Sequence, residues 1–249
     1  MERFNDMMLS GKFVSPEEYK RLKRMFIVGI IFAFITMVGG EMPVGWTVYP
    51  DAENELISMM MGCGSLSLAQ LASGVLFGGI GIPVQYYGYK AIGEIISKGG
   101  CKKCGRLIDI GAKAVAFFGS PVHLMCIALM FLCRTQDAQN ATNIPQNVMD
   151  FIIWLVLPLT VVFMTFYISM TIVMIIPVVK GKTIFPKWAV VFNPIFYKIL
   201  LNMLAEVAPN TAWFNGIRMS NMGLGSFVTF LGLLILSDRN YSKERSLDS

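Results

Sequence analysis

Residues 151–179 read FIIWLVLPLTVVFMTFYISMTIVMIIPVV, a run that contains no Asp, Glu, Lys, Arg or His. A helix needs roughly 20 predominantly apolar residues to cross the hydrocarbon core of a bilayer. Three further stretches, 56–89, 114–133 and 219–237, contain no Asp, Glu, Lys or Arg. The chain is therefore expected to be an integral membrane protein.

The composition agrees with this interpretation, because 55% of the residues are hydrophobic and 15% are charged, against about 25% charged residues in soluble domains. We predict one all-α transmembrane domain over residues 1–249, a multi-pass protein of the cell membrane with about six spans. The alternation typical of a transmembrane β-barrel is absent. The spans are expected near 25–45, 66–89, 111–133, 151–178, 188–207 and 220–237.

The basic residues predict that both termini are cytoplasmic. Threading the chain through six spans leaves 17 of its 21 Lys and Arg residues on one side, whereas Arg134 and Arg218 fall on the other. Loops rich in Lys and Arg stay in the cytoplasm. The net charge of +5 is thus interpreted as a topology signal, and we expect no binding of nucleic acid.

A short cytoplasmic amphipathic helix within residues 1–24 is predicted to lead into the first span. Residues 15–18 read Ser-Pro-Glu-Glu, which is typical of an N-cap, a proline at the first helical position and a capping-box acid. Phe13, Tyr19 and Leu22 would then lie at the membrane surface.

The five cysteines are not expected to form a disulfide framework. Cys101 and Cys104 fall in the basic loop after the second span, within Gly-Gly-Cys-Lys-Lys-Cys-Gly at 99–105, which is like half of a zinc ribbon. A four-ligand site needs a second pair, and the single histidine, His123, lies inside a span. We therefore predict a tight basic turn, with no metal and no cofactor.

The span near 188–207 is the least hydrophobic of the six. Lys198, Asn202 and Glu206 follow one another at i, i+4 and i+8, which aligns a cation, an amide and a carboxylate in one stripe. Lys198 lies about 15 Å beyond Trp188, too deep to reach water by snorkelling. The stripe is expected to face the interior of the bundle.

Two further titratable groups are expected at intermediate depth. Glu41 lies about 24 Å along from Met25, and His123 about 18 Å in from Gly111, in spans that run in the same direction. Their heights differ by roughly one helical turn, so we expect the two side chains to share a cavity. Alternatively, Glu41 only reaches the headgroups, and His123 bonds a backbone carbonyl freed by Pro121.

Together these features predict one polar cavity in the outer half to the middle of the bilayer. The glycines between 74 and 81 and Pro83 would open the backbone of the second span there, or would only allow tight helix packing. The spans near 151–178 and 220–237 are expected to supply no polar group. The candidate ligand-binding residues are Glu41, Gln70, His123, Lys198, Asn202 and Glu206.

The chain contains several distinctive short motifs: Gly40-Glu41, Gly-Gly-Ile-Gly-Ile-Pro at 78–83 with Gly88, the mid-helix His123, Phe-Pro-Lys-Trp at 185–188, and Asn193-Pro194. In these motifs the chain resembles a family of uncharacterised bacterial and archaeal membrane proteins of similar length with about six spans. The resemblance covers nearly the whole chain. It implies a six-span fold and no particular activity.

Two better-known families of membrane enzymes do not fit. The ceramidase-like hydrolases bind zinc through three histidines, whereas this chain has one. The emopamil-binding sterol isomerases use a histidine with intramembrane carboxylates, which His123, Glu41 and Glu206 could imitate. The spacing and the surrounding motifs differ.

We expect a small permease or binding protein, surrounded by membrane lipids, whose cavity takes a small polar or amphiphilic ligand. Glu41 and His123 would be the titrating pair, and Lys198 would anchor an anionic group. A competing interpretation is an intramembrane enzyme that acts on a lipid-like substrate with His123 as general acid or base. A third is a structural or sensory subunit whose polar groups only join helices. The ligand and the oligomeric state stay open.

Overall fold

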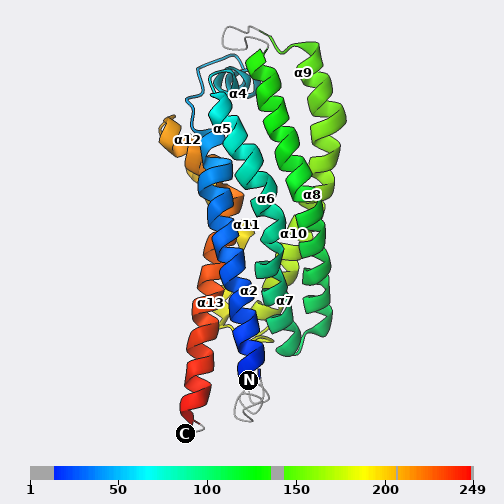
Figure 1. The fold of residues 1–249 in the computed structure, drawn as a ribbon, viewed down its shortest axis with the longest axis vertical. Coiled ribbons are helices and arrows are strands. Elements are labelled where there is room, and N and C mark those ends of the chain that lie inside the picture. The colour runs from blue at the N-terminus through cyan, green and yellow to red at the C-terminus, as the bar shows by residue number, and fades with distance from the viewer. Residues whose placement is uncertain (1–13, 136–142, 206, 248–249) are drawn as a thin grey trace.

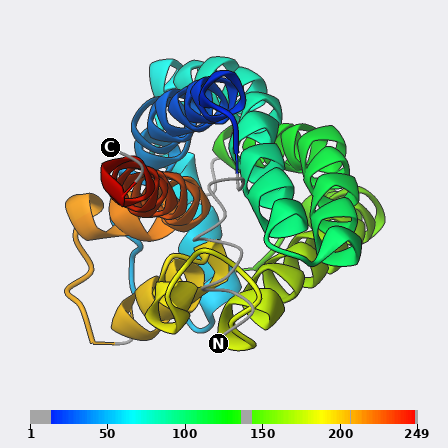
Figure 2. The same cartoon turned by 90° about the horizontal axis from the view of Figure 1, so that it is seen from below.

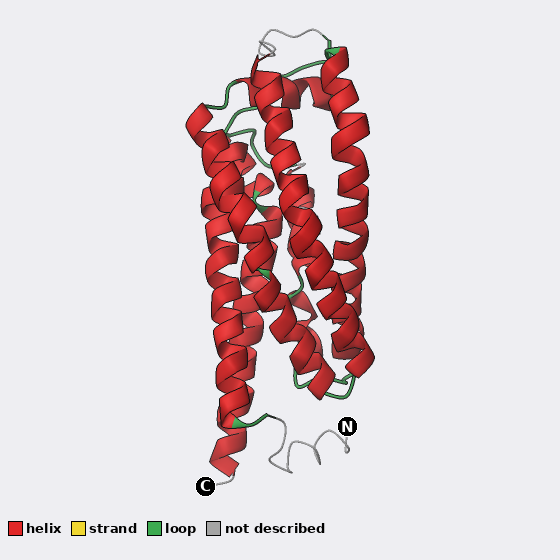
Figure 3. Ribbon diagram, turned by 45° about the vertical axis from the view of Figure 1, so that its right-hand side comes forward, coloured by secondary structure: helices red, strands yellow, loops and turns green. Residues whose placement is uncertain are grey.

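The computed structural model describes residues 14–135, 143–205 and 207–247, which form helices and no strands (Figures 1 and 3). Within this part, five helices are long and apolar enough to cross a membrane. Their outward faces carry large exposed apolar side chains such as Phe117 (72% exposed) and Trp154 (74%), as a surface against lipid requires. The five spans are Pro16–Gly45, Leu68–Lys98, Lys102–Thr135, Gln146–Val179 and Asn221–Tyr241.

Three of the five spans contain a π-helical segment, at which the backbone hydrogen-bond ladder changes register. The first span comprises α2 (Pro16–Ile35), π-helical η1 (Thr36–Glu41) and α3 (Met42–Gly45). The second comprises α5 (Leu68–Ser73), π-helical η2 (Gly74–Gly78), α6 (Gly79–Val84) and α7 (Tyr86–Lys98). The fourth comprises α9 (Gln146–Phe151), π-helical η4 (Ile152–Val156) and α10 (Leu157–Val179).

The remaining spans are single helices, α8 (Lys102–Thr135) and α13 (Asn221–Leu247). Four shorter elements connect the spans: α4 (Glu55–Gly64), the 3-10 turn η5 (Lys187–Val191), α11 (Pro194–Ala205) and α12 (Ala212–Met219).

The helices form a ring in the order α2, α7, α8, α10, α11 and α13, and α13 packs on α2 to close it (Figure 2). The first residues of α2 and the last residues of α13 lie at one end of the bundle (Figure 1). The opposite end, called the α4 end below, carries α4, α5, α9 and α12 (Figure 1).

The structure corrects the continuous helix predicted near 188–207. The chain forms η5, breaks at Asn193 and resumes as α11, whose 12 residues rise about 18 Å, well short of the roughly 30 Å hydrocarbon core. Pro194 has no N–H to donate, and the Asn193 side chain bonds the interrupted backbone instead. Its Oδ1 accepts from the N–H of Ile195 at 3.1 Å, and its Nδ2 donates to the carbonyl of Thr171 at 2.9 Å.

The predicted start of the first helix is confirmed. Ser15 is the N-cap of α2, and its hydroxyl accepts from the N–H of Glu18 at 3.3 Å. The surface position predicted for Leu22 is wrong, because this side chain is 1% exposed in the core of the bundle. The helix packs against α7 and α13 from its first turns onward, so Leu22 meets protein instead of lipid. Phe13 lies outside the described residues.

Glycines bring the first and second spans into backbone contact. A Cβ added at Gly40 would lie 2.7 Å from the backbone nitrogen of Gly78, closer than real Cβ contacts. The two residues belong to the π-helical segments η1 and η2, which pack against each other. The glycines of the second span therefore allow close packing and coincide with an irregular backbone.

Cys101 and Cys104 form a disulfide in the turn between α7 and α8. This bond corrects the expected plain basic turn for this pair. The three-residue separation at the start of a helix leaves the two Cα atoms 5.2 Å apart, within the usual range for a disulfide. Gly100 has a φ of +106°, which side chains rarely adopt, and it turns the chain just before the pair.

Thiol counting tests this disulfide. Unreduced protein is expected to yield three alkylated thiols on denaturation, those of Cys63, Cys126 and Cys133, and five after reduction. Intact-mass measurement gives the count. In the control Cys101→Ser, the thiol of Cys104 is released, so four thiols should react without reductant. Five alkylated thiols in the unreduced native chain would exclude the bond.

Candidate functional site

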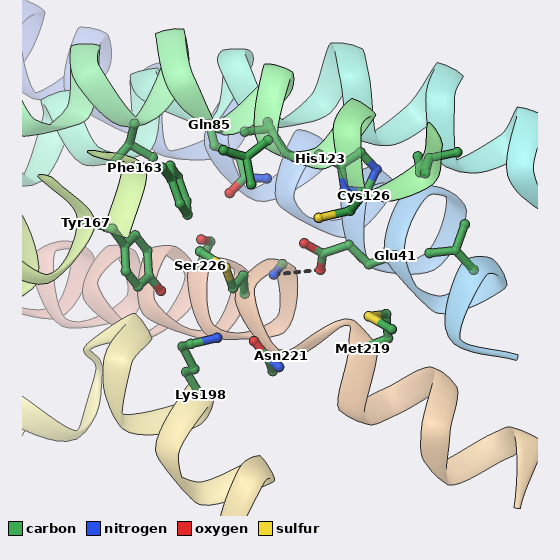
Figure 4. A pocket seen from close by; sticks show the side chains of 18 of the residues that line it. Glu41, Gln85, His123, Cys126, Phe163, Tyr167, Lys198, Met219, Asn221 and Ser226 are labelled. Atoms are coloured by element: carbon green, nitrogen blue, oxygen red, sulfur yellow. Dashed lines mark hydrogen bonds between the residues drawn. The ribbon is translucent and has the colours of Figure 1, made fainter. Parts of the chain in front are cut away.

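A cavity of about 220 Å³ lies within the ring of helices (Figure 4). Its walls come from all five spans and from α11 and α12. Most of the lining is apolar. The polar and titratable lining residues are Glu41, Gln85, Tyr89, His123, Cys126, Tyr167, Lys198, Asn221 and Ser226.

Glu41 is the last residue of η1 and is 7% exposed. Its Oε2 accepts from the backbone N–H of Gly223 at 2.9 Å. Gly223 lies in the first turn of α13, where N–H groups have no partner within the helix and the helix dipole favours a negative charge. The Glu41 carboxylate therefore caps α13. The alternative, in which this side chain only reaches the lipid headgroups, does not agree with its burial.

His123 projects from α8 into the same cavity as Glu41 (Figure 4). Its Nε2 lies 3.0 Å from the carbonyl oxygen of Gly74, the first residue of η2. A carbonyl oxygen only accepts, so Nε2 carries the hydrogen and donates it. The alternative prediction, that His123 bonds a backbone carbonyl, is therefore correct for Nε2. The carbonyl belongs to Gly74 of the second span, however, and is not one freed by Pro121.

Lys198 extends from α11 into the cavity (Figure 4). The carboxylate of Glu41 is close enough to interact with it electrostatically. Among the described residues, however, the Lys198 ammonium makes no ion pair at 4.0 Å or less and no hydrogen bond. The cavity thus holds a cation and a carboxylate that do not contact each other.

Two further polar atoms of the lining have no hydrogen-bond partner in the described structure, the hydroxyl of Tyr167 and Oδ1 of Asn221. Tyr167 is 1% exposed, so its hydroxyl cannot be satisfied at the protein surface. Buried polar groups are normally hydrogen-bonded. These two atoms therefore mark where a ligand or water would find partners.

Other polar lining groups are already paired. The hydroxyls of Tyr89 and Ser226 lie 2.7 Å apart, and Nε2 of Gln85 donates to the hydroxyl of Thr36 at 3.0 Å. These contacts join α7 to α13 and the second span to the first. These polar groups therefore stabilise the packing of the helices, whereas the Lys198 ammonium and the Tyr167 hydroxyl have no such partner among the described residues.

Two of the predicted site residues, Gln70 and Asn202, do not line this cavity, and a third is not among the described residues. Gln70 belongs to the capping box of α5 with Ser67, and its Nε2 donates to the carbonyl oxygens of Pro43 and Trp46 at 3.0 and 3.1 Å. Asn202 is exposed and does not line the cavity. Glu206 lies outside the described residues. Of the predicted stripe, Lys198 lines the cavity and Asn202 does not.

The expectation that the spans near 151–178 and 220–237 supply no polar group is wrong. α10 contributes Tyr167, and α13 contributes Asn221 and Ser226. A tyrosine within the long apolar run and polar residues at the start of the last helix were the available signals. Neither carries a full charge, which is why charge-based reasoning passed over them.

A second cavity of about 200 Å³ lies at the α4 end, lined by Tyr49, Glu55, Arg218 and neighbouring residues. Here the charges contact each other, since Arg218 and Glu55 are 3.6 Å apart. Burial raises the pKa of Tyr49 to about 12, so its hydroxyl stays protonated at neutral pH. In neither cavity do described residues form a group of three or more His, Cys, Asp or Glu side chains that could hold a metal ion.

Residues 7–240 match the model of a family described as a family of unknown function (DUF6796). No curated protein and no solved structure matches the chain. The roles of the cavity residues are therefore argued from their geometry.

Proposed function

The chain belongs to the DUF6796 family of unknown function. From the geometry of the cavity, we propose that it is a small membrane permease or binding protein that takes a small polar or amphiphilic ligand. The observation that carries the proposal is the cation at Lys198, which shares an apolar-walled cavity with the carboxylate of Glu41 without pairing to it. Unpaired charges within a membrane protein are costly and usually mark a functional site.

The proposal includes the topology that the basic residues favour, with about six crossings and both termini in the cytoplasm, as in bacterial and archaeal proteins of the resembling kind. α11 and α12 would together form the sixth, broken crossing, as discontinuous helices do in many transporters. The Cys101–Cys104 disulfide would then face the reducing cytosol, where such bonds open and close with the redox state. A reporter fused after Ser249 tests the orientation, and periplasmic activity would reverse it.

An intramembrane enzyme is a second candidate, and the tautomer of His123 favours it. Because Nε2 donates to Gly74, Nδ1 keeps a free lone pair. No described residue bonds to Nδ1, so this nitrogen could accept a proton from a lipid-like substrate in the cavity. Glu41 lines the same cavity and would be its partner.

Cys126 is a natural reporter for access to the cavity, because it is a free cysteine of the lining. We expect small thiol reagents to alkylate it in intact vesicles when Cys63 and Cys133 are replaced by alanine and Cys101 and Cys104 by serine. The matched control keeps Cys63 as the one free cysteine, since this residue is buried outside the cavity. Its labelling should require denaturation.

The side of entry separates the functions. Reaction of Cys126 with a charged methanethiosulfonate from both faces of the membrane supports a permease, and reaction from one face supports a binding protein. Reaction only with lipid-soluble N-ethylmaleimide favours an enzyme that draws its substrate from the bilayer. If Cys126 reacts no faster than Cys63, the cavity is closed, and the structural or sensory role replaces the proposal.

A further inference from the structure

We propose that the cavity binds a zwitterion, with its acidic oxyanion held by Lys198 and Tyr167 and its ammonium group held by Glu41. This inference rests on the proposed function, because it names the chemical class of ligand for the same cavity. It follows from four polar atoms that have no hydrogen-bond partner in the described structure.

Two of these atoms are donors on neighbouring helices of the ring. The Lys198 ammonium on α11 carries three N–H groups and no acceptor, and the Tyr167 hydroxyl on α10 can donate as well. Both side chains border the same part of the cavity (Figure 4). A carboxylate or phosphate oxygen would receive charge-assisted hydrogen bonds from this pair.

The other two atoms are acceptors. Oε2 of Glu41 is bonded to the N–H of Gly223 at 2.9 Å, which leaves Oε1 without a described partner. Nδ2 of Asn221 donates to the carbonyl of Arg218 at 2.7 Å, which leaves Oδ1 free. The Glu41 carboxylate suits an ammonium group, which only donates, and the Asn221 amide oxygen can accept from a second donor of the ligand.

Charge balance selects a ligand with both groups. Lys198 and Glu41 interact electrostatically but do not form an ion pair. A bound anion would leave the carboxylate unmatched, and a bound cation would leave the ammonium unmatched, each at a cost in a medium of low dielectric. A zwitterion matches both charges and leaves the occupied cavity with no net charge from this pair.

The size and walls of the cavity limit the rest of the ligand. About 220 Å³ is less than the roughly 300–1,000 Å³ of pockets that enclose drug-sized molecules. Apolar side chains such as Val115, Ile127 and Phe163 form most of the walls. The ligand is therefore a small free zwitterion or the zwitterionic headgroup of a lipid, and phosphoethanolamine chemistry is common to both sources.

Two lipids that differ only at the cationic group test the inference. Dioleoyl phosphatidylethanolamine and dioleoyl phosphatidylglycerol share the phosphate and the acyl chains, but the first has an ammonium where the second has hydroxyls. Native mass spectrometry of the full chain, titrated with each lipid, should show at least roughly 10-fold tighter binding of the ethanolamine lipid. Competition by soluble glycerophosphoethanolamine would identify the free zwitterion as the source, and its failure would identify the lipid headgroup.

Variants assign the two ends of the site. Glu41→Gln should reduce the preference to below about 2-fold while phosphatidylglycerol still binds, because the anion end is intact. Tyr167→Phe removes one hydroxyl without changing the shape of the side chain, so it should weaken both lipids by about 3- to 10-fold and keep their ratio. Tyr167→Phe also provides a test if Glu41→Gln fails to fold, since Glu41 caps α13.

The outcomes separate this inference from the proposed function. Equal binding of the two lipids by the native chain, or an undiminished preference in Glu41→Gln, would overturn the zwitterion and leave a ligand-binding cavity. Binding of no probe, lipid or soluble, would overturn both.

Discussion

A Lys198→Met protein is expected to bind the cavity ligand roughly 10- to 100-fold more weakly than the native chain, since hydrogen bonds to charged groups contribute about 1.5–3 kcal/mol. Methionine is similar in length to the apolar stem of lysine, so the variant mainly removes the ammonium group. Titration by native mass spectrometry, or ligand protection of Cys126 from alkylation, measures the loss. Asn202→Met is the matched control on the same helix, because Asn202 is exposed outside the cavity.

The same variant should be more stable than the native chain when no ligand is bound. Removing an ammonium that has no described ion-pair partner is expected to stabilise the empty protein by about 0.5–2 kcal/mol, as replacement of strained functional groups commonly does. Thermal unfolding in detergent gives the sign. Loss of stability together with unchanged ligand binding would show that Lys198 has a structural role instead.

Gly40→Ala is expected to separate the first two spans and to lower the free energy of unfolding by about 1–3 kcal/mol. The added Cβ would meet the backbone nitrogen and Cα of Gly78 at 2.7 and 2.8 Å, and a backbone cannot swing aside as a flexible side chain can. A lower midpoint of thermal unfolding, with less folded protein recovered from the membrane, is the expected result.

Gly79→Ala is the control for this substitution. A Cβ there would lie 3.5 Å from the side chain of Leu124 and 4.0 Å from the hydroxyl of Ser120, which are ordinary contacts. Because alanine favours helix more than glycine, this variant should be unchanged or up to about 1 kcal/mol more stable. Equal stability of Gly40→Ala and Gly79→Ala would mean that the two spans do not touch at Gly40.

The long spans were predictable because hydropathy and charge act on each segment separately. The run at 151–179 needs no partner to be recognised as helical in lipid, and the cap at Ser15 depends only on its next three residues. The prediction of a continuous span near 188–207 was wrong, because Pro194 breaks the helix although the average hydropathy of the segment permits a crossing.

The cavity was less predictable because its residues meet across the ring of helices. Glu41, His123 and Lys198 stood out as titratable groups at membrane depth, and the structure brings all three to one cavity. Gln70 was predicted as a binding residue, although Ser67 and Gln70 have the Ser-x-x-Gln spacing of a capping box, which the structure forms at the start of α5. Tyr167 is a polar residue within its apolar run, but the sequence does not show where its hydroxyl points, since the packing of α10 against the ring determines this.

An experimental structure of the full chain in nanodiscs of native lipid tests the central claim most directly, because it distinguishes an occupied cavity from an empty, closed one. The proposed function predicts density in the cavity that belongs to no side chain, and the zwitterion inference places one end of it at the Lys198 ammonium and the Tyr167 hydroxyl and the other at the Glu41 carboxylate. An empty, closed cavity in which the Lys198 ammonium bonds directly to the Glu41 carboxylate, at about 2.7–2.9 Å, would contradict it.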